Sequence, residues 1–187
     1  MRLFVALALP AAVREALAAT QARLQRDAHP VRWSDTSKLH LTLQFLGEAD
    51  AAVVAPLLAG LARLEVAPLR LTLSGLGAFP GLQQPRVIWV GVAGDIDALG
   101  RLQAAVVELT KPLGFAVESR AFAPHLTLGR VRPEARPAQL RALAATLRAT
   151  EPPPPLSWQA GRPILYQSTL TPHGPSYTAL GPVTSDG

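Results

Sequence analysis

The 187-residue chain carries 18 Lys and Arg residues against 13 Asp and Glu residues, which gives a formal net charge of +5, and it has no cysteine. The absence of cysteine excludes a disulfide framework, a thiolate nucleophile and a cysteine-based metal site, and it fits a reducing cytoplasm. The positive charge suits a polyanion such as RNA. Abundant Arg, Ala and Pro along the whole chain are explained equally well by a base-composition bias in the genome, so charge alone identifies no partner.

The first residues combine a charged start with an apolar run, as a short signal peptide does. Within that run, leucines and a valine alternate with Phe4 and small alanines, and Pro10 ends it. We therefore predict a buried strand over residues 2–9 and an amphipathic helix over residues 11–26. No uncharged apolar run elsewhere reaches the roughly 18 to 20 residues that cross a bilayer, so we expect a soluble, cytoplasmic protein without membrane contact.

Hydrophobic periodicity predicts the elements that follow. Apart from the two motif strands described next, the predicted strands cover residues 31–33, 69–76, 86–92, 163–170 and 176–180, and the predicted helices cover residues 51–64, 95–113 and 137–150. Four prolines at residues 152–155 predict a stiff connector. Because strands and helices do not alternate steadily, we predict an α+β fold with antiparallel sheets and outer helices.

One tetrapeptide occurs twice: His40-Leu43 and His125-Leu128 both have the sequence His-Leu-Thr-Leu. Alternation of this kind predicts two half-buried strands, each with its histidine and threonine on one face and its leucines on the other. If the two strands meet across a cleft, they supply two imidazoles and two hydroxyls to one site. A single strand histidine is more often structural, and it is the repetition that points to chemistry.

Such a site is equipped for metal-free acid–base chemistry on a phosphodiester. A neutral histidine accepts a proton from the attacking oxygen, and a charged histidine donates one to the leaving oxygen. The hydroxyls of Thr42 and Thr127 can donate to the non-bridging phosphoryl oxygens. Because the tetrapeptides are identical, the residues alone do not say which histidine is the acid and which the base.

The chain resembles the two-histidine phosphoesterase superfamily and, within it, the bacterial and archaeal RNA 2′,3′-cyclic phosphodiesterases, also known as 2′-5′ RNA ligases. Besides the motifs, the resemblance is carried by Arg2-Leu3-Phe4-Val5-Ala6-Leu7, by Gly75-Leu76-Gly77-Ala78-Phe79-Pro80, by Arg86-Val87-Ile88-Trp89-Val90-Gly91 and by a closing stretch over residues 168–177. It implies one bilobal domain over residues 1–187, with two lobes related by an approximate two-fold axis around a central cleft and one motif in each lobe.

The resemblance also implies an activity. It is hydrolysis of a 2′,3′-cyclic phosphate, on an RNA end or a cyclic nucleotide, to a 2′-phosphate, with His40 as proton donor and His125 as the proton acceptor that activates water. Weak 2′-5′ ligation is implied as a secondary activity. We expect no cofactor, no metal and a monomeric protein.

Residues beside the motifs are candidates for substrate binding. Arg130 could hold a phosphate as a forked, charged donor, and Phe45 could stack on a base, although a core position is the more expected one for Phe45. Strict alternation places both away from the histidines, and Arg130 reaches the cleft only if Gly129 permits a twist or bulge. Alternation places Gln44 on the face of His40, where we would expect Arg in many relatives, and this predicts a weaker hold on RNA or a different preference for substrate length.

Two other classes of function compete with this one. A metal hydrolase is disfavoured, because the chain has no His-Glu-x-x-His, no close histidine pair and no carboxylate in either motif strand. An RNA-binding module without chemistry fits the charge but leaves the repeated His-Thr pairing unexplained. Activity in the presence of a chelator would separate the three classes.

The remaining histidines and the tryptophans are expected to be ordinary structural residues. His29 and His173 fall in predicted turns and are expected to be solvated. Trp33, Trp89 and Trp158 are expected to be packing residues, with Trp33 the best placed of them to meet a base near the cleft.

Overall fold

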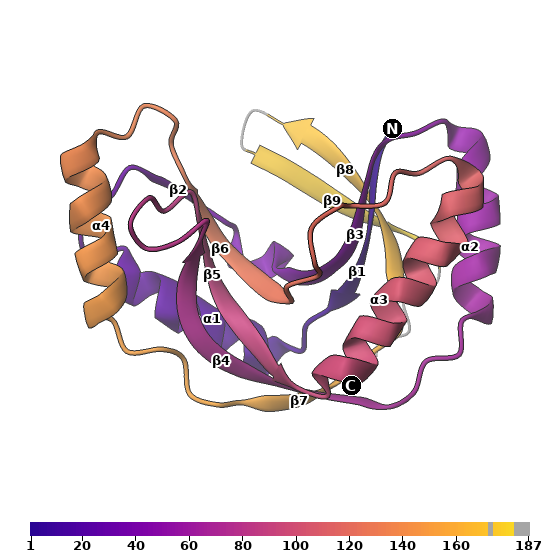
Figure 1. Ribbon diagram of the computed structural model, residues 1–187, viewed down its shortest axis with the longest axis horizontal. Helices are drawn as coiled ribbons and strands as arrows, with labels where there is room; N and C mark the ends of the chain where they lie inside the picture. Colours follow the sequence, from indigo (N-terminus) through magenta and orange to yellow (C-terminus); the bar gives the residue numbers. More distant parts are fainter. Residues whose placement is uncertain (172–173, 182–187) are drawn as a thin grey trace.

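The computed structural model describes residues 1–171 and 174–181 as an α+β fold (Figure 1). The helices are α1 (Ala11–Leu24), α2 (Val54–Arg63), α3 (Ile96–Thr110) and α4 (Pro137–Ala149), with short 3₁₀ turns η1 (Thr36–Lys38), η2 (Ala51–Val53) and η3 (Lys111–Leu113). The strands are β1 (Arg2–Ala8), β2 (Val31–Trp33), β3 (His40–Glu48), β4 (Leu69–Phe79), β5 (Val87–Gly94), β6 (His125–Val131), β7 (Ser157–Ala160), β8 (Ile164–Thr171) and β9 (Gly174–Leu180). The predicted fold class is confirmed.

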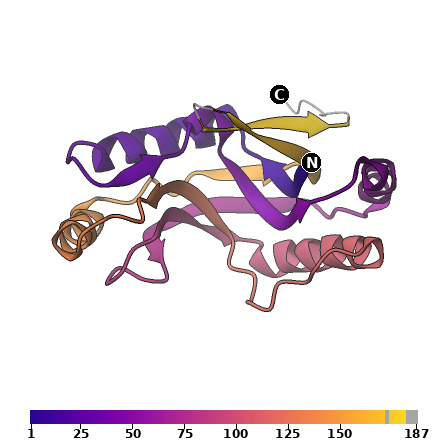
Figure 2. The ribbon, with the colours of Figure 1, turned by 90° about the horizontal axis from the view of Figure 1, so that it is seen from above.

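The strands form two antiparallel sheets, which define the two lobes. Sheet A is four-stranded, in the order β3-β1-β8-β9, and sheet B is five-stranded, in the order β2-β6-β5-β4-β7. Helices α2 and α3 lie on the side of sheet A, and α1 and α4 lie on the side of sheet B (Figures 1 and 2). The motif strands β3 and β6 belong to different sheets.

Each motif strand buries its leucines against the helices of its own lobe. Leu41 and Leu43 of β3 are at most 3% exposed, and Leu126 and Leu128 of β6 are fully buried. Burial of a leucine contributes about 1.5 to 3 kcal/mol. These side chains hold both strands with the opposite face, the one that carries histidine and threonine, directed away from the helices.

Most predicted elements are present, and the amino-terminal run is strand β1, with Leu3, Val5 and Leu7 at most 1% exposed. Strand β7 is a difference, since it pairs with the first four residues of β4 although no strand was predicted there. Its four residues follow the prolines too closely for periodicity to detect. No helix in the described ranges is long and apolar enough to cross a membrane.

The prediction that His29 is a solvated loop residue is wrong. Its side chain is only 6% exposed. Its Nε2 lies 3.0 Å from Thr146 Oγ1 of α4, and that hydroxyl donates to Asp27 Oδ2 at 3.0 Å. The turn after α1 therefore docks on α4, a contact between distant segments that local sequence does not reveal. His173 lies outside the described residues.

Candidate active site

Strand β3 contains a β-bulge one residue after its threonine. The ladder to β1 passes from Thr42 directly to Gln44, so Leu43 is an extra residue. Because an extra residue reverses the alternation beyond it, Phe45 lies on the face of His40 and Gln44 on the helix-covered face. Burial agrees, since Gln44 is 4% exposed and Phe45 is 54% exposed. The predicted faces of Gln44 and Phe45 are therefore wrong, and Phe45 is not a core residue.

Strand β6 contains the same bulge in the same place. Its ladder to β5 passes from Thr127 directly to Gly129, which leaves Leu128 as the extra residue. Arg130 therefore lies on the face of His125. The bulge at Gly129 that the sequence analysis required for this position is present. The order of buried and accessible residues is the same in the first seven residues of β3 and in β6. Phe45 and Arg130 occupy equivalent positions in the two strands.

The two bulges are supported differently. In β3, Gln44 Oε1 accepts a hydrogen bond of 2.9 Å from Thr110 Oγ1, which fastens the strand to α3. Gln44 is thus a structural residue that faces away from the histidines. In β6, the carbonyl of the extra residue Leu128 accepts hydrogen bonds from the amide of Ser34 at 2.8 Å and from Gln21 Nε2 of α1 at 3.0 Å.

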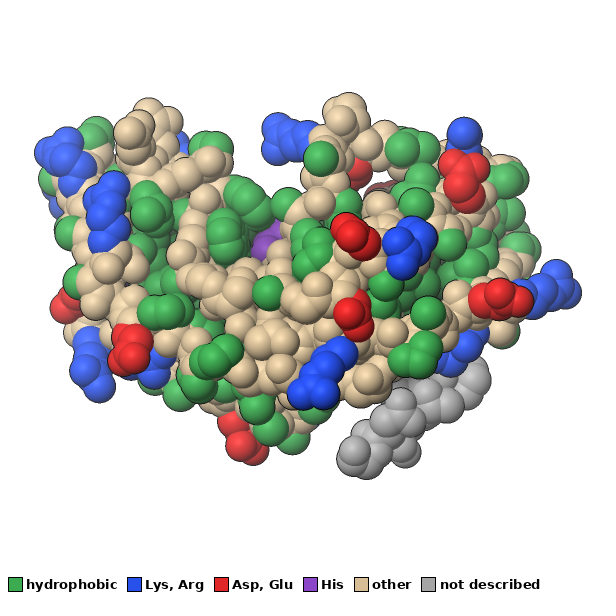
Figure 3. Space-filling model, turned by 60° about the horizontal axis from the view of Figure 1, so that its bottom comes forward, with side chains coloured by type: hydrophobic (Ala, Val, Ile, Leu, Met, Phe, Trp, Pro, Cys, Tyr) green, Lys and Arg blue, Asp and Glu red, His purple; other side chains and the backbone are tan. Residues whose placement is uncertain are grey.

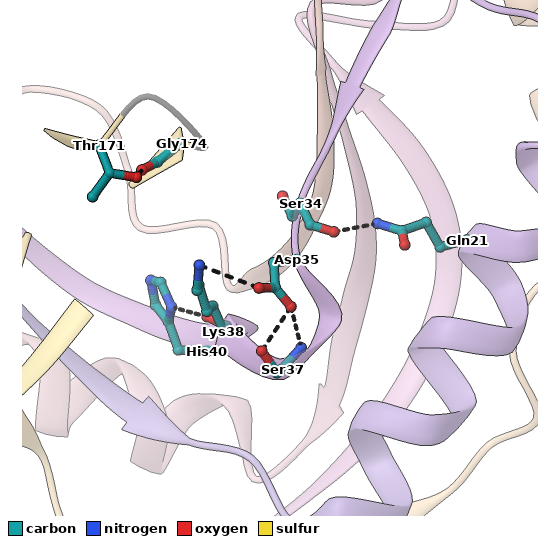
Figure 4. Close-up of polar contacts among 8 residues, drawn as sticks. All are labelled: Gln21, Ser34, Asp35, Ser37, Lys38, His40, Thr171 and Gly174. Atoms are coloured by element: carbon teal, nitrogen blue, oxygen red, sulfur yellow. Dashed lines mark hydrogen bonds and ion pairs between the residues drawn. The ribbon is translucent and has the colours of Figure 1, made fainter. Parts of the chain in front are cut away.

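Gln21 also ties β6 to the segment that leads into β3. The same Nε2 donates to the carbonyl of Ser34 at 2.8 Å, just before the turn η1 (Figure 4). Asp35 caps that turn by accepting from the Ser37 hydroxyl at 2.6 Å and from the Lys38 ammonium at 3.2 Å. The hydroxyl of Ser37 is the main reason that the pKa of Asp35 lies below its ordinary value. This ordered turn fixes the backbone from which β3 begins.

Both motif histidines are oriented by the backbone two residues before them. His40 Nδ1 lies 2.8 Å from the Lys38 carbonyl, and His125 Nδ1 lies 2.7 Å from the Ala123 carbonyl. A carbonyl only accepts, so Nδ1 carries the hydrogen in both rings and Nε2 is the nitrogen left to exchange protons. Within the described residues, neither Nε2 has a hydrogen-bond partner. In both imidazoles, Nε2 is therefore the atom available for proton exchange.

Strands β3 and β6 contact each other where the two lobes meet. A space-filling view shows a hollow between the lobes with histidine atoms inside it (Figure 3). We call this hollow the cleft. The faces that carry His40 with Thr42 and His125 with Thr127 are the accessible faces opposite the buried leucines, so these four residues are the candidates for its walls.

His40 lies in an aromatic cluster made of Phe4, Tyr166 and Tyr177. Its ring centroid is 4.7 Å from that of Phe4 and 5.2 Å from that of Tyr177, which meets it edge-on at 88°. Burial by these rings lowers the pKa of His40, and the hydrogen bond to the Lys38 carbonyl opposes part of this shift. Burial also raises the pKa of Tyr166. The neutral form of His40 is therefore favoured in the free protein.

His125 has a different environment. The ring of Phe79 meets it edge-on with the centroids 4.9 Å apart. Phe79 in turn contacts Trp89 at 5.1 Å, and Trp89 pairs with Thr127 across the ladder. Trp89 therefore lies on the cleft face, where its ring fills the space above Gly77, since a Cβ on that glycine would come within 2.4 Å of it.

The other tryptophans lie away from the cleft. Trp33 pairs with Gly129 and packs where a Cβ on that glycine would meet it at 3.0 Å, on the helix-covered face of sheet B. The expectation that Trp33 is the best placed tryptophan to meet a base is therefore wrong, because its ring lies on the opposite face of sheet B. Trp158 is 7% exposed and is a packing residue, as predicted.

The aromatic neighbours of the histidines were missed by sequence reasoning. Alternation in β1 places Phe4 with Ala6 and Ala8 on the face opposite the leucines, and these alanines pair with Thr42 and His40. This row of small residues beside one aromatic residue could have indicated that Phe4 lies next to His40. No local signal identified Tyr177, because it reaches His40 only through a sheet that joins distant parts of the chain.

The described residues contain no group of three or more His, Asp or Glu side chains close enough to hold a metal ion. Neither Thr42 nor Thr127 uses its hydroxyl in a hydrogen bond within this part of the chain, so both hydroxyls are free to donate. The chemistry that these side chains offer is proton transfer at two nitrogens and hydrogen-bond donation at two oxygens.

Two antiparallel sheets with one His-x-Thr strand each, facing a shared cleft, are the features of a two-histidine phosphoesterase. Comparison with family models agrees, because the model for LigT-like phosphoesterases matches residues 7–89 and again residues 90–177. The chain belongs to this family, and it contains the family's repeat twice.

Its relatives include proteins named RNA 2′,3′-cyclic phosphodiesterase. The one from Aeropyrum pernix is 37% identical over 81% of this chain and 84% of its own length, and the one from Archaeoglobus fulgidus is 34% identical over 96% and 98%. Among solved structures, a protein from Thermus thermophilus has a TM-score of 0.79 at 33% identity, covering 97% of this chain and 96% of its own. E. coli LigT complexed with 3′-AMP has a TM-score of 0.76 at 30% identity, covering 96% and 95%.

Proposed function

We propose that this protein is an RNA 2′,3′-cyclic phosphodiesterase that opens the cyclic phosphate to a 2′-phosphate without a metal ion. The proposal is supported by the activity for which its relatives are named. It rests above all on one observation: His40 and His125 are held in the same way, each with Nδ1 on a backbone carbonyl and Nε2 free. Two such nitrogens at one cleft suit a reaction that removes a proton on one side of phosphorus and supplies one on the other.

In the proposed reaction, water attacks phosphorus while His125 Nε2 accepts its proton. The new bond joins the water oxygen to phosphorus, and the bond from phosphorus to O3′ breaks. His40, in its charged form, donates its Nε2 proton to the departing O3′. Thr42 and Thr127 donate hydrogen bonds to the two non-bridging oxygens, on which negative charge increases in the transition state.

The assignment of donor and acceptor rests on family resemblance, and burial adds a requirement to it. Because burial lowers the pKa of His40, the ring must gain its proton when the substrate binds. An anionic phosphate in the cleft favours the charged imidazole, and it therefore raises the pKa of His40 at the moment when a donor is needed.

Phe45 and Arg130 are the proposed substrate-binding residues. Phe45 is an exposed aromatic ring on the face of His40, suited to stacking on the terminal base. Arg130 is an exposed guanidinium on the face of His125, suited to a phosphate. The same site would catalyse weak 2′-5′ ligation if a 5′-hydroxyl took the place of water. We propose that the protein works as a monomer.

The decisive experiment is hydrolysis of a short RNA ending in a 2′,3′-cyclic phosphate, measured with and without a chelator. The position of the product phosphate is then determined by phosphorus NMR. We expect a 2′-phosphate, formed at the same rate with the chelator present. Loss of activity with the chelator would indicate a metal hydrolase, and binding without turnover would indicate an RNA-end-binding module.

A sulfur substrate tests the roles of the histidines. When the 3′-bridging oxygen is replaced by sulfur, the leaving thiolate needs no proton, so the general acid becomes dispensable. We expect the sulfur substrate to restore turnover in His40→Ala and not in His125→Ala. The opposite pattern would reverse the roles, and rescue of neither variant would exclude acid catalysis by either ring.

A further inference from the structure

Arg32 lies directly across the β-ladder from Arg130. Strand β2 is the edge strand of sheet B, and it pairs with β6 in the register Val31 to Val131, Arg32 to Arg130 and Trp33 to Gly129. Directly paired residues of antiparallel strands point to the same face, with their Cβ atoms about 4.5 to 5.5 Å apart. Because the bulge places Arg130 on the same face of the sheet as His125, Arg32 lies on that face as well.

The neighbours of Arg32 support this direction. Val31 is 6% exposed, and both Val31 and Trp33 pack where a Cβ on Gly129 would meet them, on the helix-covered face. Alternation along β2 then leaves Arg32, the exposed residue between them, on the cleft face. Arg32 and Arg130 are therefore neighbours on the same face of sheet B.

The pair has no negative partner in the protein. Within residues 1–171 and 174–181, neither Arg32 nor Arg130 forms an ion pair or a side-chain hydrogen bond, whereas Lys38 is neutralised by Asp35. Like charges directly opposite each other destabilise a pair of strands. An anion between the two guanidinium groups removes that repulsion, and phosphate fits their forked donors best.

The spacing places this anion one step away from the reacting phosphate. On β5, the ladder partners of Thr127 and Arg130 are Trp89 and Val87. These are two residues apart, which corresponds to about 7 Å along the strand. A cyclic phosphate held at Thr127 and an anion held at Arg130 are thus separated by a distance comparable with that between consecutive phosphates of a nucleic acid strand.

We propose that Arg32 and Arg130 together bind the backbone phosphate on the 5′ side of the terminal nucleotide, so that the protein prefers an RNA strand to a cyclic mononucleotide. This rests on the proposed function, which places the cyclic phosphate between the histidines. It assigns a role to Arg32 and specifies which phosphate Arg130 binds.

The test compares three substrates: cytidine 2′,3′-cyclic phosphate, the dinucleotide CpC with a 2′,3′-cyclic phosphate end, and the same dinucleotide with a neutral methylphosphonate linkage. We expect kcat/KM to be about tenfold or more higher for the charged dinucleotide than for the mononucleotide, as for one lost contact to a charged group. The neutral dinucleotide should resemble the mononucleotide. In Arg32→Ala the ratio of dinucleotide to mononucleotide should fall close to one, and Arg32→Lys should restore part of it.

Arg141→Ala is the matched control, since Arg141 is an exposed arginine on the outer helix α4 and should leave the ratio unchanged. Melting temperatures of all variants show whether they fold. The inference is overturned if the wild type has the same kcat/KM for the mononucleotide and for the dinucleotide with the ordinary phosphate linkage. It is also overturned if Arg32→Ala lowers kcat/KM equally for these two substrates. Either result leaves the proposed function intact.

If neither cyclic substrate is hydrolysed, the proposed function fails and the arginine pair is tested by binding. Calorimetry then compares a 3′-phosphorylated CpC with its methylphosphonate analogue. Tighter binding of the charged dinucleotide that is lost in Arg32→Ala supports the pair, and equal binding of the two dinucleotides overturns it.

Discussion

Strands β3 and β6 share a tetrapeptide, a bulge and an order of burial, but their surroundings differ. His40 is enclosed by three aromatic rings contributed by β1, β8 and β9. His125 meets a single phenylalanine edge in sheet B. The motif thus fixes which nitrogen of each imidazole is free, while the neighbouring strands around His40 bury its ring and lower its pKa. Two identical motifs thus have two different surroundings.

The largest expected effect comes from removing either imidazole. His40→Ala and His125→Ala should each lower kcat by about 10²- to 10⁴-fold, the usual contribution of a general acid or base. Steady-state rates on a cyclic-phosphate RNA measure this. His29→Asn is the control, because it removes a buried structural histidine and should lower the melting temperature rather than kcat. Near-normal kcat in either motif variant would remove that histidine from the mechanism.

Loss of one hydroxyl should cost less. Thr42→Ala and Thr127→Ala should each raise the barrier by about 2 to 4 kcal/mol, as for one donor to a developing oxyanion. The effect should fall on kcat, and Thr→Ser at the same positions should recover most of it because the hydroxyl is kept. If the Thr→Ser variant is as inactive as the Thr→Ala variant at either position, that threonine contributes through its shape and not through a hydrogen bond.

Removing the aromatic ring from β3 should affect binding. Phe45→Ala should weaken binding of a base-carrying substrate by about 1 to 3 kcal/mol, the usual value of one stacked base. An abasic ribose 2′,3′-cyclic phosphate is the control substrate, and its KM should not change. Equal losses for both substrates would mean that Phe45 supports the strand and does not bind the base. Phe45→Tyr should retain affinity.

The smallest expected effect concerns the pKa of His40. Because the aromatic cluster buries this ring, its NMR titration should lie below the ordinary value of 6.5, and in Tyr177→Ala it should move up toward that value. Since the folded state binds the proton less well than the unfolded state, the wild type should lose stability as the pH falls below about 6.5, and the variant should lose less. Tyr177→Phe should behave as the wild type. An unchanged titration in Tyr177→Ala would mean that the other rings suffice.

Sequence periodicity predicted the fold class, most element positions and the face of each motif histidine, because all of these depend on local alternation. It failed just beyond Leu43, where the bulge reverses the faces of Gln44 and Phe45. Nothing in the residue types marks that bulge, since it depends on how β1 pairs with β3. In the second motif, the glycine at position 129 did indicate that a bulge was possible. Contacts between distant segments, such as His29 with α4, were beyond local reasoning altogether.

The strand orders have a consequence for how the molecule is assembled. The two family repeats, residues 7–89 and 90–177, do not coincide with the two sheets. The first repeat supplies β2 and β4 to sheet B, and the second supplies β8 and β9 to sheet A. During synthesis, β1 therefore lacks one of its two neighbours until β8 has emerged from the ribosome. The boundary between the repeats also divides β5 (Val87–Gly94), and residues 2–6 of β1 precede the first repeat, so neither repeat contains a complete sheet.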